Sequence, residues 1–525
     1  MGFGNEVANI LDDIRKEKEN ERCCVSNEIV VAGERLVQVA TGLWQDVKDD
    51  IVELVKNEIP YEYPQVAVWW YSVLINVKKD PAVLQEFLLY IRRNKDAFSV
   101  HTQYFLWYQI FSLMFNYWEL NIQKLKIEMW KFYIEITEEF AKEAAVPLDI
   151  IPNEERDKDF VIVIAEQFLT IKHGPTKTAL DRCKALLTKC GKKVFLINTG
   201  EAIPQIGRIP FYHTVKGNYL PEKTKEKVQS WKGVTIPYYQ CEYNMPNMDT
   251  INKLLRDIRL CPPEYIIMIG KGGILGGLAS RMVPTLAVGL CPSDFEYTCA
   301  KYQTLSKNLE EQDLEILKSV GHTKRHVIES VFTSSLKPQA EHITKEMLGV
   351  PEDKFLMIVV GARLDFEVTD EFLSMLEQVM EPDMFVGFLG QFRNYQNYME
   401  GYSVLKEQSG YFGFCQDILS RMEVCDLYIN PIRKGGGTSC VEAMFMGVPV
   451  ITVSYGDVAV NAGAEFCVKD YSEMQKKILE YYSDKRFYKE MSEVAKQRAG
   501  ILLDTDSEFV KIIQELEKRE QEEAE

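Results

Sequence analysis

The chain has 525 residues, of which 46% are hydrophobic and 26% charged, with a formal net charge of −17. This length is too great for one ordinary hydrophobic core and predicts two or three globular domains. The negative charge repels phosphate backbones, and no extended basic stretch offsets it, so we expect no nucleic-acid partner.

The N-terminal segment and the cysteines bear on the cellular compartment. Residues 1–21 carry charges where a secretion signal needs an apolar run, so we expect a cytoplasmic protein. The twelve cysteines are scattered, and none forms a C-x-x-C pair. Since cytoplasmic thiols stay reduced, we expect free cysteines and neither disulfides nor a thiolate metal site.

Residues 1–150 predict an all-helical N-terminal domain, because apolar residues recur there at helical spacing. Its many aromatic residues either form the core or, in part, bind an acceptor molecule. Residues 97–118 contain no Lys, Arg, Asp or Glu and are long enough to cross a bilayer. His101, Gln103, Gln109 and Asn116 interrupt this stretch, so we expect a buried helix or helical pair, with peripheral membrane contact as the alternative.

Two α/β domains are predicted next, at residues 155–340 and 341–500. Continuous apolar runs such as residues 160–169 are typical of strands buried on both faces of a parallel sheet. Helical stretches alternate with these runs, and strand, small-residue turn, helix and strand form one half of a nucleotide-binding fold. Residues 342–354 are expected to be helical, and residues 501–525 to form a helix with a solvated acidic tail.

The most informative stretch is residues 431–453, PIRKGGGTSCVEAMFMGVPVITV. Its three glycines, which include Gly436 and Gly437, let the backbone approach a ligand, and the following helix offers unpaired amides and a positive dipole end. This combination predicts an anion site. Thr438 and Ser439 add hydroxyl donors for phosphate oxygens, and Glu442 is placed to accept both hydroxyls of a ribose.

A purely structural interpretation of the same residues is also open. Ser439 followed three residues later by Glu442 matches a capping box, which would stabilise the start of a helix without any ligand. The combination of the glycines, Glu442 and the GVPVI segment in one α/β unit favours the binding site.

This stretch resembles the C-terminal donor-binding motif of the family-4 type of two-domain, GT-B fold glycosyltransferases. Residues 442–444 and 447–451 match the second half of that motif, and the order of elements matches over residues 158–500. The resemblance implies two Rossmann-like domains facing a cleft, with the acceptor on the first domain and the donor on the second. It places Glu442 on the donor ribose. The first glutamate of the motif falls on Lys434, which leaves the sugar and the stereochemistry open.

Two cations are expected at the donor diphosphate. By the resemblance, Arg363 follows the strand whose terminal arginine grips the diphosphate, a role that suits a forked and permanently charged guanidinium. The alternative for Arg363 is a surface ion pair. The family's partner lysine is missing from residues 365–370, and Lys434 either replaces it, as in protein O-GlcNAc type transferases, or is a solvated side chain.

Three further residues are assigned by their place in the family pattern. The turn that contains His173 and Gly174 occupies the position of the first Gly-rich loop, which faces the donor phosphates and the acceptor. His173 is therefore a candidate base or acceptor ligand, or else a turn histidine without a role. Phe414 lies where the family holds the nucleobase, or is a core aromatic.

No His, Cys and Asp cluster with metal-ligand spacing occurs in the sequence, so we expect sugar transfer without a metal or other cofactor. The predicted activity moves a sugar from a nucleotide diphosphate sugar, with UDP favoured, to a glycan or protein acceptor. Two alternatives remain open. One is a catalytically silent glycosyltransferase-like binding subunit, and the other is a nucleotide-sugar epimerase, which can use the same fold.

Overall fold

The computed structural model describes residues 8–9, 11, 25–59, 63–202, 204–215 and 217–524. The prediction about a secretion signal falls on residues that lie largely outside these ranges, as do Cys23 and Cys24. All ten cysteines within the described ranges are free, as predicted.

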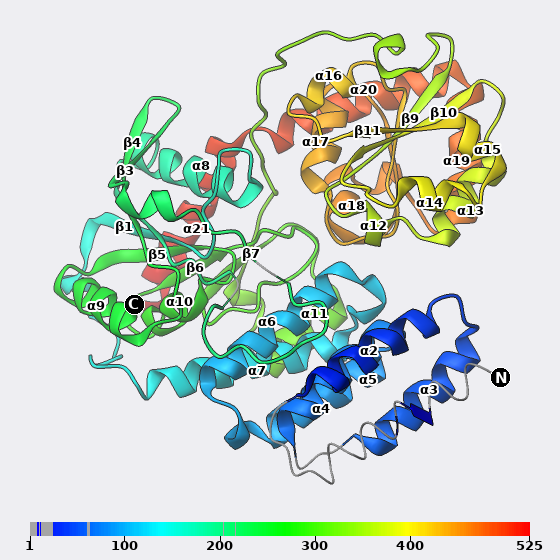
Figure 1. The fold of residues 1–525 in the computed structure, drawn as a ribbon. Coiled ribbons are helices and arrows are strands. Elements are labelled where there is room, and N and C mark those ends of the chain that lie inside the picture. Colours follow the sequence, from blue (N-terminus) through cyan, green and yellow to red (C-terminus); the bar gives the residue numbers. More distant parts are fainter. Residues whose placement is uncertain are drawn as a thin grey trace.

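The N-terminal part is helical, as predicted, and lies along one side of the molecule in Figure 1. The 97–118 stretch forms the buried helix α6, where the Ser99 hydroxyl accepts a hydrogen bond from the Thr102 amide and so caps the first turn. Trp107 on this helix is fully buried. None of the helices in the described segments is long and apolar enough to cross a membrane. The helices are α2 (Asn27–Ala40), α3 (Gln45–Glu58), α4 (Pro64–Val77), α5 (Pro81–Arg93), α6 (Val100–Asn116) and α7 (Gln123–Ala141).

The first α/β domain is built on an eight-stranded sheet with the order β3-β4-β2-β1-β5-β6-β7-β8. All neighbouring strands are parallel except the β3–β4 pair. The chain runs outward from β1 to β2 and then returns to the other side of β1 with β5. Ligands of open α/β sheets bind beyond the carboxyl ends of strands where the order reverses in this way. The strands are β1 (Asp157–Ala165), β2 (Lys193–Asn198), β3 (Val228–Trp231), β4 (Val234–Gln240), β5 (Pro263–Ile269), β6 (Thr285–Val288), β7 (Tyr302–Leu305) and β8 (Val327–Glu329).

The helices of this domain include α8, whose first residues Gly174 and Pro175 begin it directly after His173. Proline is well tolerated there, because the first turn of a helix leaves its amides unpaired in any case. Gly191 follows with a φ of 68°, a backbone conformation that favours glycine, and the helix has ended by then. These helices are α8 (Gly174–Thr188), α9 (Met248–Leu260), α10 (Gly273–Ala279) and α11 (Glu311–Ser319).

The second α/β domain has a parallel sheet of six strands with the order β11-β10-β9-β12-β13-β14. Its order reverses between β9 and β12. The strands are β9 (Phe355–Gly361), β10 (Met384–Gly390), β11 (Ser409–Gly413), β12 (Leu427–Ile429), β13 (Val450–Val453) and β14 (Cys467–Val468). The helices are α12 (Leu364–Glu367), α13 (Asp370–Val379), α14 (Tyr395–Met399), α15 (Ser403–Gln408), α16 (Ile418–Met422), α17 (Gly437–Phe445), α18 (Gly456–Ala462), α19 (Tyr471–Ser483) and α20 (Lys485–Leu502).

One sequence prediction about a connection is wrong. The segment 342–354 contains only a short 3-10 helix, η6 (Glu346–Leu348), because Gly349 follows with a φ of 76° and Pro351 cannot continue a helix. The predicted C-terminal helix is α21 (Thr505–Ala524), and residues 521–523 of its acidic tail are exposed, as predicted, but the helix before them is not a free end. Figure 1 shows it running back from the second α/β domain to the first, where it packs against α8. Its apolar face, with Phe509 and Leu516, is fully buried there.

Candidate active site

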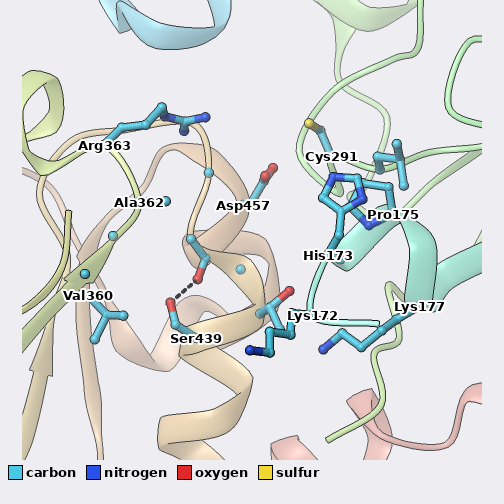
Figure 2. Close-up of a pocket in the computed structure, with 18 of the residues that line it drawn as sticks. Lys172, His173, Pro175, Lys177, Cys291, Val360, Ala362, Arg363, Ser439 and Asp457 are labelled. Atoms are coloured by element: carbon cyan, nitrogen blue, oxygen red, sulfur yellow. Dashed lines mark hydrogen bonds between the residues drawn. The ribbon is translucent and has the colours of Figure 1, made fainter. Parts of the chain in front are cut away.

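A cavity of about 810 Å³ lies where the two α/β domains and helix α6 meet. Figure 2 shows Arg363 and Ser439 on one wall and His173 and Lys177 on the opposite wall. The carboxyl ends of β1 and β5 contribute to its lining, as do those of β9 and β12. The cavity therefore lies at the point of reversal of both sheets, where the topology predicts ligand binding.

The backbone of the Gly-rich turn after β12 lines the cavity on the side of the second domain. Gly436 has a φ of 100°, and a Cβ atom placed on it would lie 2.5 Å from Nη2 of Arg433. Both the backbone conformation and the space thus require glycine. Helix α17 begins at the next residue, and no side chain caps it. Its first amides and its positive dipole end are available to an anion in the cavity.

The capping-box interpretation of Ser439 and Glu442 does not hold. Helix α17 begins at Gly437, so both residues lie inside the helix rather than at its cap. The Ser439 hydroxyl donates a hydrogen bond of 2.9 Å to the carbonyl of Gly436, drawn as the dashed line in Figure 2. Glu442 lines the cavity instead of closing the helix start.

Arg363 belongs to a charged network beneath the Gly-rich turn. Its guanidinium donates hydrogen bonds of 2.8 and 3.2 Å to Oε1 of Glu367. The other oxygen of Glu367 accepts a hydrogen bond of 2.7 Å from Arg433, which is itself buried. Burial alone would raise the pKa of Glu367, but Arg433 and Arg363 lower it below its ordinary value. One carboxylate thus holds two guanidinium groups at the cavity.

Glu442 is held in an environment that disfavours its charge. Burial raises the pKa of its carboxyl to about 7, against the opposing effect of Lys177 and Lys337. Both lysines line the cavity and come from the side of the first α/β domain. A carboxylate facing lysines across a cleft is suited to a ligand that offers hydroxyl donors on one side and anionic oxygens on the other.

The opposite wall carries the turn between β1 and α8. His173 lies in the cavity lining, and its Nδ1 is 3.0 Å from the hydroxyl oxygen of Thr176. Burial lowers the pKa of His173 to about 4, so its imidazole is neutral at pH 7. A neutral imidazole can accept a proton from a reacting hydroxyl.

A buried ion pair marks the point of reversal of the first sheet. Glu166 follows β1, Lys271 follows β5, and the Glu166 Oε2 and Lys271 Nζ atoms are 3.2 Å apart. Both residues line the cavity and are almost fully buried. The second oxygen of Glu166, Oε1, has no hydrogen-bond partner among the described residues. Buried polar atoms are rarely left unpaired, which points to a ligand group at this position.

Comparisons with known proteins give a family for the second α/β domain. Residues 341–498 match the family model described as Glycosyl transferases group 1. The second α/β domain is called the group 1 domain after this match. A search of curated proteins finds no significant match to the chain.

Solved structures agree on the fold. A mutant O-GlcNAc transferase from Thermobaculum terrenum is similar over 99% of this chain and 98% of that chain, with 10% identity and a TM-score of 0.58. A glycosyltransferase from Rickettsia africae is similar over 69% of this chain and 99% of that chain, with 14% identity and a TM-score of 0.51. HepE from Anabaena in complex with UDP is similar over 68% of this chain and 99% of that chain, with 14% identity and a TM-score of 0.48. The first two confirm the predicted GT-B fold.

Most of the site residues predicted from the sequence line the cavity. Those from the group 1 domain are Arg363, Phe414, Gly436, Gly437, Thr438, Ser439 and Glu442, and those from the first α/β domain are His173 and Gly174. Phe414 is 67% exposed, which excludes the core-aromatic alternative. In the part of the chain that the structure describes, no three His, Cys, Asp or Glu side chains are grouped so as to hold a metal ion.

Lys434 is placed differently from the other predicted residues of the group 1 domain. It does not belong to the cavity lining, and its Nζ lies 3.1 Å from Oδ2 of buried Asp294 in the first α/β domain. The same oxygen lies 2.9 Å from Nζ of Lys126 on helix α7. Burial opposes its charge, but Asp294 and neighbouring groups raise the pKa of Lys434 well above its ordinary value. Lys434 thus links the group 1 domain to its neighbours, and a phosphate contact stays a prediction.

Several residues that no sequence motif assigned to the site also reach the cavity. Arg433, Glu367, Glu166, Lys271 and Phe115 all line the cavity. A signal existed for Glu367, which stands four residues after Arg363, a spacing that allows contact across the short helix α12.

Proposed function

We propose that the protein transfers a sugar from a nucleotide diphosphate sugar, with UDP as the expected nucleotide, to a hydroxyl group of a glycan or protein acceptor. The observation that carries this proposal is the cavity of about 810 Å³ that lies between the two points of sheet reversal. One wall offers Arg363, Glu442 and the start of α17, and the other offers His173 and the Glu166–Lys271 pair. The family match and the GT-B fold support glycosyl transfer.

The donor would lie against the group 1 domain. Its ribose hydroxyls would donate to Glu442, and its diphosphate would lie between Arg363 and the first amides of α17. Phe414 lies at the rim of the same wall, where a nucleobase would stack on its exposed ring.

The acceptor would enter from the side of the first α/β domain and helix α6. Its hydroxyl oxygen would bond to the anomeric carbon of the sugar while the bond from that carbon to the diphosphate oxygen breaks. Neutral His173 is placed to take the hydroxyl proton, and Arg363 is placed to stabilise the charge that develops on the leaving diphosphate. Glu166 and Lys271 together offer an acceptor and a donor for acceptor hydroxyls.

A screen of nucleotide sugars by thermal unfolding tests the proposal. A bound donor at a hundred times its dissociation constant stabilises the folded state by about 2.7 kcal/mol. We expect a UDP-sugar to raise the unfolding temperature, and product analysis with an acceptor panel then identifies the transfer. A protein that no nucleotide or nucleotide sugar stabilises would refute the proposed donor site.

Donor affinity should depend on pH through Glu442. Because the pKa of this carboxyl is raised to about 7, it loses its charge as the pH falls below that value and accepts ribose hydroxyls less well. If binding requires the carboxylate, the dissociation constant of UDP-glucose should rise roughly tenfold per pH unit below pH 7. The phosphates of UDP-glucose are diesters that do not titrate in this range, and the matched control is Glu442→Gln, whose profile should be flat. Coinciding profiles would show that Glu442 does not bind the donor.

Transfer is proposed to need no metal ion, because side-chain cations and helix amides are available to neutralise the leaving diphosphate. We expect full turnover after treatment with EDTA, measured as release of the nucleoside diphosphate. Loss of turnover that manganese or magnesium restores would contradict this expectation.

A catalytically silent binding subunit is the second candidate, favoured by the ion pair between Lys434 and Asp294. That pair removes from the cavity the residue that stands at the position of the family's first glutamate. Donor turnover by the purified protein separates the two functions, since a silent subunit binds the nucleotide sugar without releasing sugar. Conversion of the donor to an epimer without any acceptor would instead identify an epimerase.

A further inference from the structure

Helix α6 of the N-terminal helical part reaches the donor wall of the cavity. Its penultimate residue, Phe115, lines the cavity, and the Cζ atom of Arg363 lies 4.5 Å from the centre of the Phe115 ring. This distance is within the range of a cation–π contact, which strengthens when water is excluded from around the cation. Arg363 thus contacts both the ring and the carboxylate of Glu367.

The Phe115 ring is held in place by the core of the helical part. It stacks on Phe111 with ring centres 6.4 Å apart, and Phe111 stacks on Trp107 at 5.5 Å. Trp107 is fully buried, and its indole nitrogen donates a hydrogen bond of 2.8 Å to the carbonyl of Met129 on helix α7. This series of rings gives Phe115 little freedom to move.

The same ring lies beside the Gly-rich turn. A Cβ atom placed on Gly435 would lie 3.1 Å from Nη2 of Arg363 and 3.9 Å from Phe115. The backbone of the turn, the guanidinium and the ring therefore meet at one point of the cavity, where the proposed function puts the donor diphosphate. Two of the three groups belong to the group 1 domain, and the third belongs to the helical part.

We propose that the N-terminal helical part completes the subsite for the diphosphate of a nucleoside diphosphate, with Phe115 as the positioning residue for Arg363. This proposal rests on the proposed function. The ring limits the orientations of a long side chain before the ligand arrives, so less rotamer entropy is lost when the guanidinium binds two phosphate oxygens. Phe115 itself makes no polar contact with the ligand.

Binding measurements with UDP and with uridine test this role, because uridine lacks the phosphates that Arg363 would hold. Fixing an arginine side chain that Phe115 no longer restrains costs about 1 to 2 kcal/mol, which corresponds to a roughly tenfold change in affinity, so Phe115→Leu should weaken UDP binding by about that factor. Uridine affinity, followed by ligand-observed NMR, should stay unchanged. Phe115→Tyr keeps the ring and should bind UDP like the wild type.

A double-mutant cycle with Arg363→Ala gives the decisive readout. If Phe115 acts through Arg363, Phe115→Leu should weaken UDP binding no further once Arg363 is absent. Phe105→Leu is the matched control, because Phe105 is a buried residue of the same helix outside the cavity lining. It should lower thermal stability without changing either affinity.

Three results would overturn the positioning role. They are a Phe115→Leu variant that binds UDP like the wild type, an equal loss for UDP and uridine, and effects of the two substitutions that add. In each case wild-type UDP binding would still uphold the donor site. A wild type that binds no UDP would overturn the proposed function, and this proposal with it.

Discussion

An Arg363→Ala variant is expected to lose about 100-fold or more in turnover, with a smaller change in donor affinity. Charge develops on the leaving diphosphate mainly as the bond to the sugar breaks, so a fixed cation there stabilises the transition state more than the bound donor. Removing one donor of this kind costs on the order of 100- to 1,000-fold in other enzymes, about 3 to 4 kcal/mol. The measurement is the split between kcat and KM with the donor that the screen identifies.

Lys434→Ala is the informative comparison for Arg363→Ala. Both cations are predicted from the sequence to bind the diphosphate, whereas the structure pairs Lys434 with Asp294 and leaves Arg363 in the cavity lining. If Lys434 serves to hold the domains together, Asp294→Asn should reproduce its loss of thermal stability. If Lys434 binds phosphate, only Lys434→Ala should weaken UDP binding. An Arg363→Ala variant with wild-type kcat would show that the diphosphate lies elsewhere.

Much of the fold could be predicted from the sequence, because buried parallel strands are continuous apolar runs. The apolar run at residues 160–169, for example, overlaps strand β1. The strands β3, β4, β7 and β8 were missed, since strands of three to seven residues at or next to the sheet edges carry little pattern of their own. The destination of α21 was also missed. An amphipathic helix reveals which face is buried but not which domain buries it.

Some residues of the site belong to local sequence motifs, and others reach the site only through tertiary packing. Arg363, Glu442 and the Gly-rich turn could be predicted, because each belongs to a short motif that follows a strand. Phe115 could not, because only the packing of α6 against the group 1 domain brings its ring to Arg363.

The neighbours Arg433 and Lys434 show a further limit of sequence reasoning. Spacing along the chain indicates a cation in this turn, but consecutive residues of a turn point in different directions. Arg433 turns toward Glu367 and the cavity, and Lys434 turns toward Asp294. No local pattern distinguishes these two directions.

A Glu367→Ala variant is expected to lose about 3 to 5 kcal/mol of unfolding free energy, the usual cost of removing one partner from a buried ion pair. Arg433 is buried, and its remaining partners, the Asn430 amide oxygen and the Tyr428 hydroxyl, are neutral. The substitution therefore leaves an uncompensated charge in the core of the group 1 domain. Urea unfolding at pH 7 measures the loss as a lower midpoint with an unchanged slope.

Two further measurements separate the loss of charge from the loss of packing around Glu367. Glu367→Gln keeps the shape, so a loss close to that of Glu367→Ala assigns the effect to the charge, and a wild-type midpoint would contradict the buried ion pair. Replacing Glu367 and Arg433 together by methionine should recover part of the stability, because apolar groups of similar volume leave no charge unpaired.

The dependence of the unfolding free energy on pH in the acid range gives an independent check. The pKa of Glu367 is lowered in the folded state, so its contribution is present above its ordinary value of 4.5 and lost as the pH falls through the lowered pKa. Wild-type stability should therefore fall in that window, and the difference from Glu367→Gln should shrink with it.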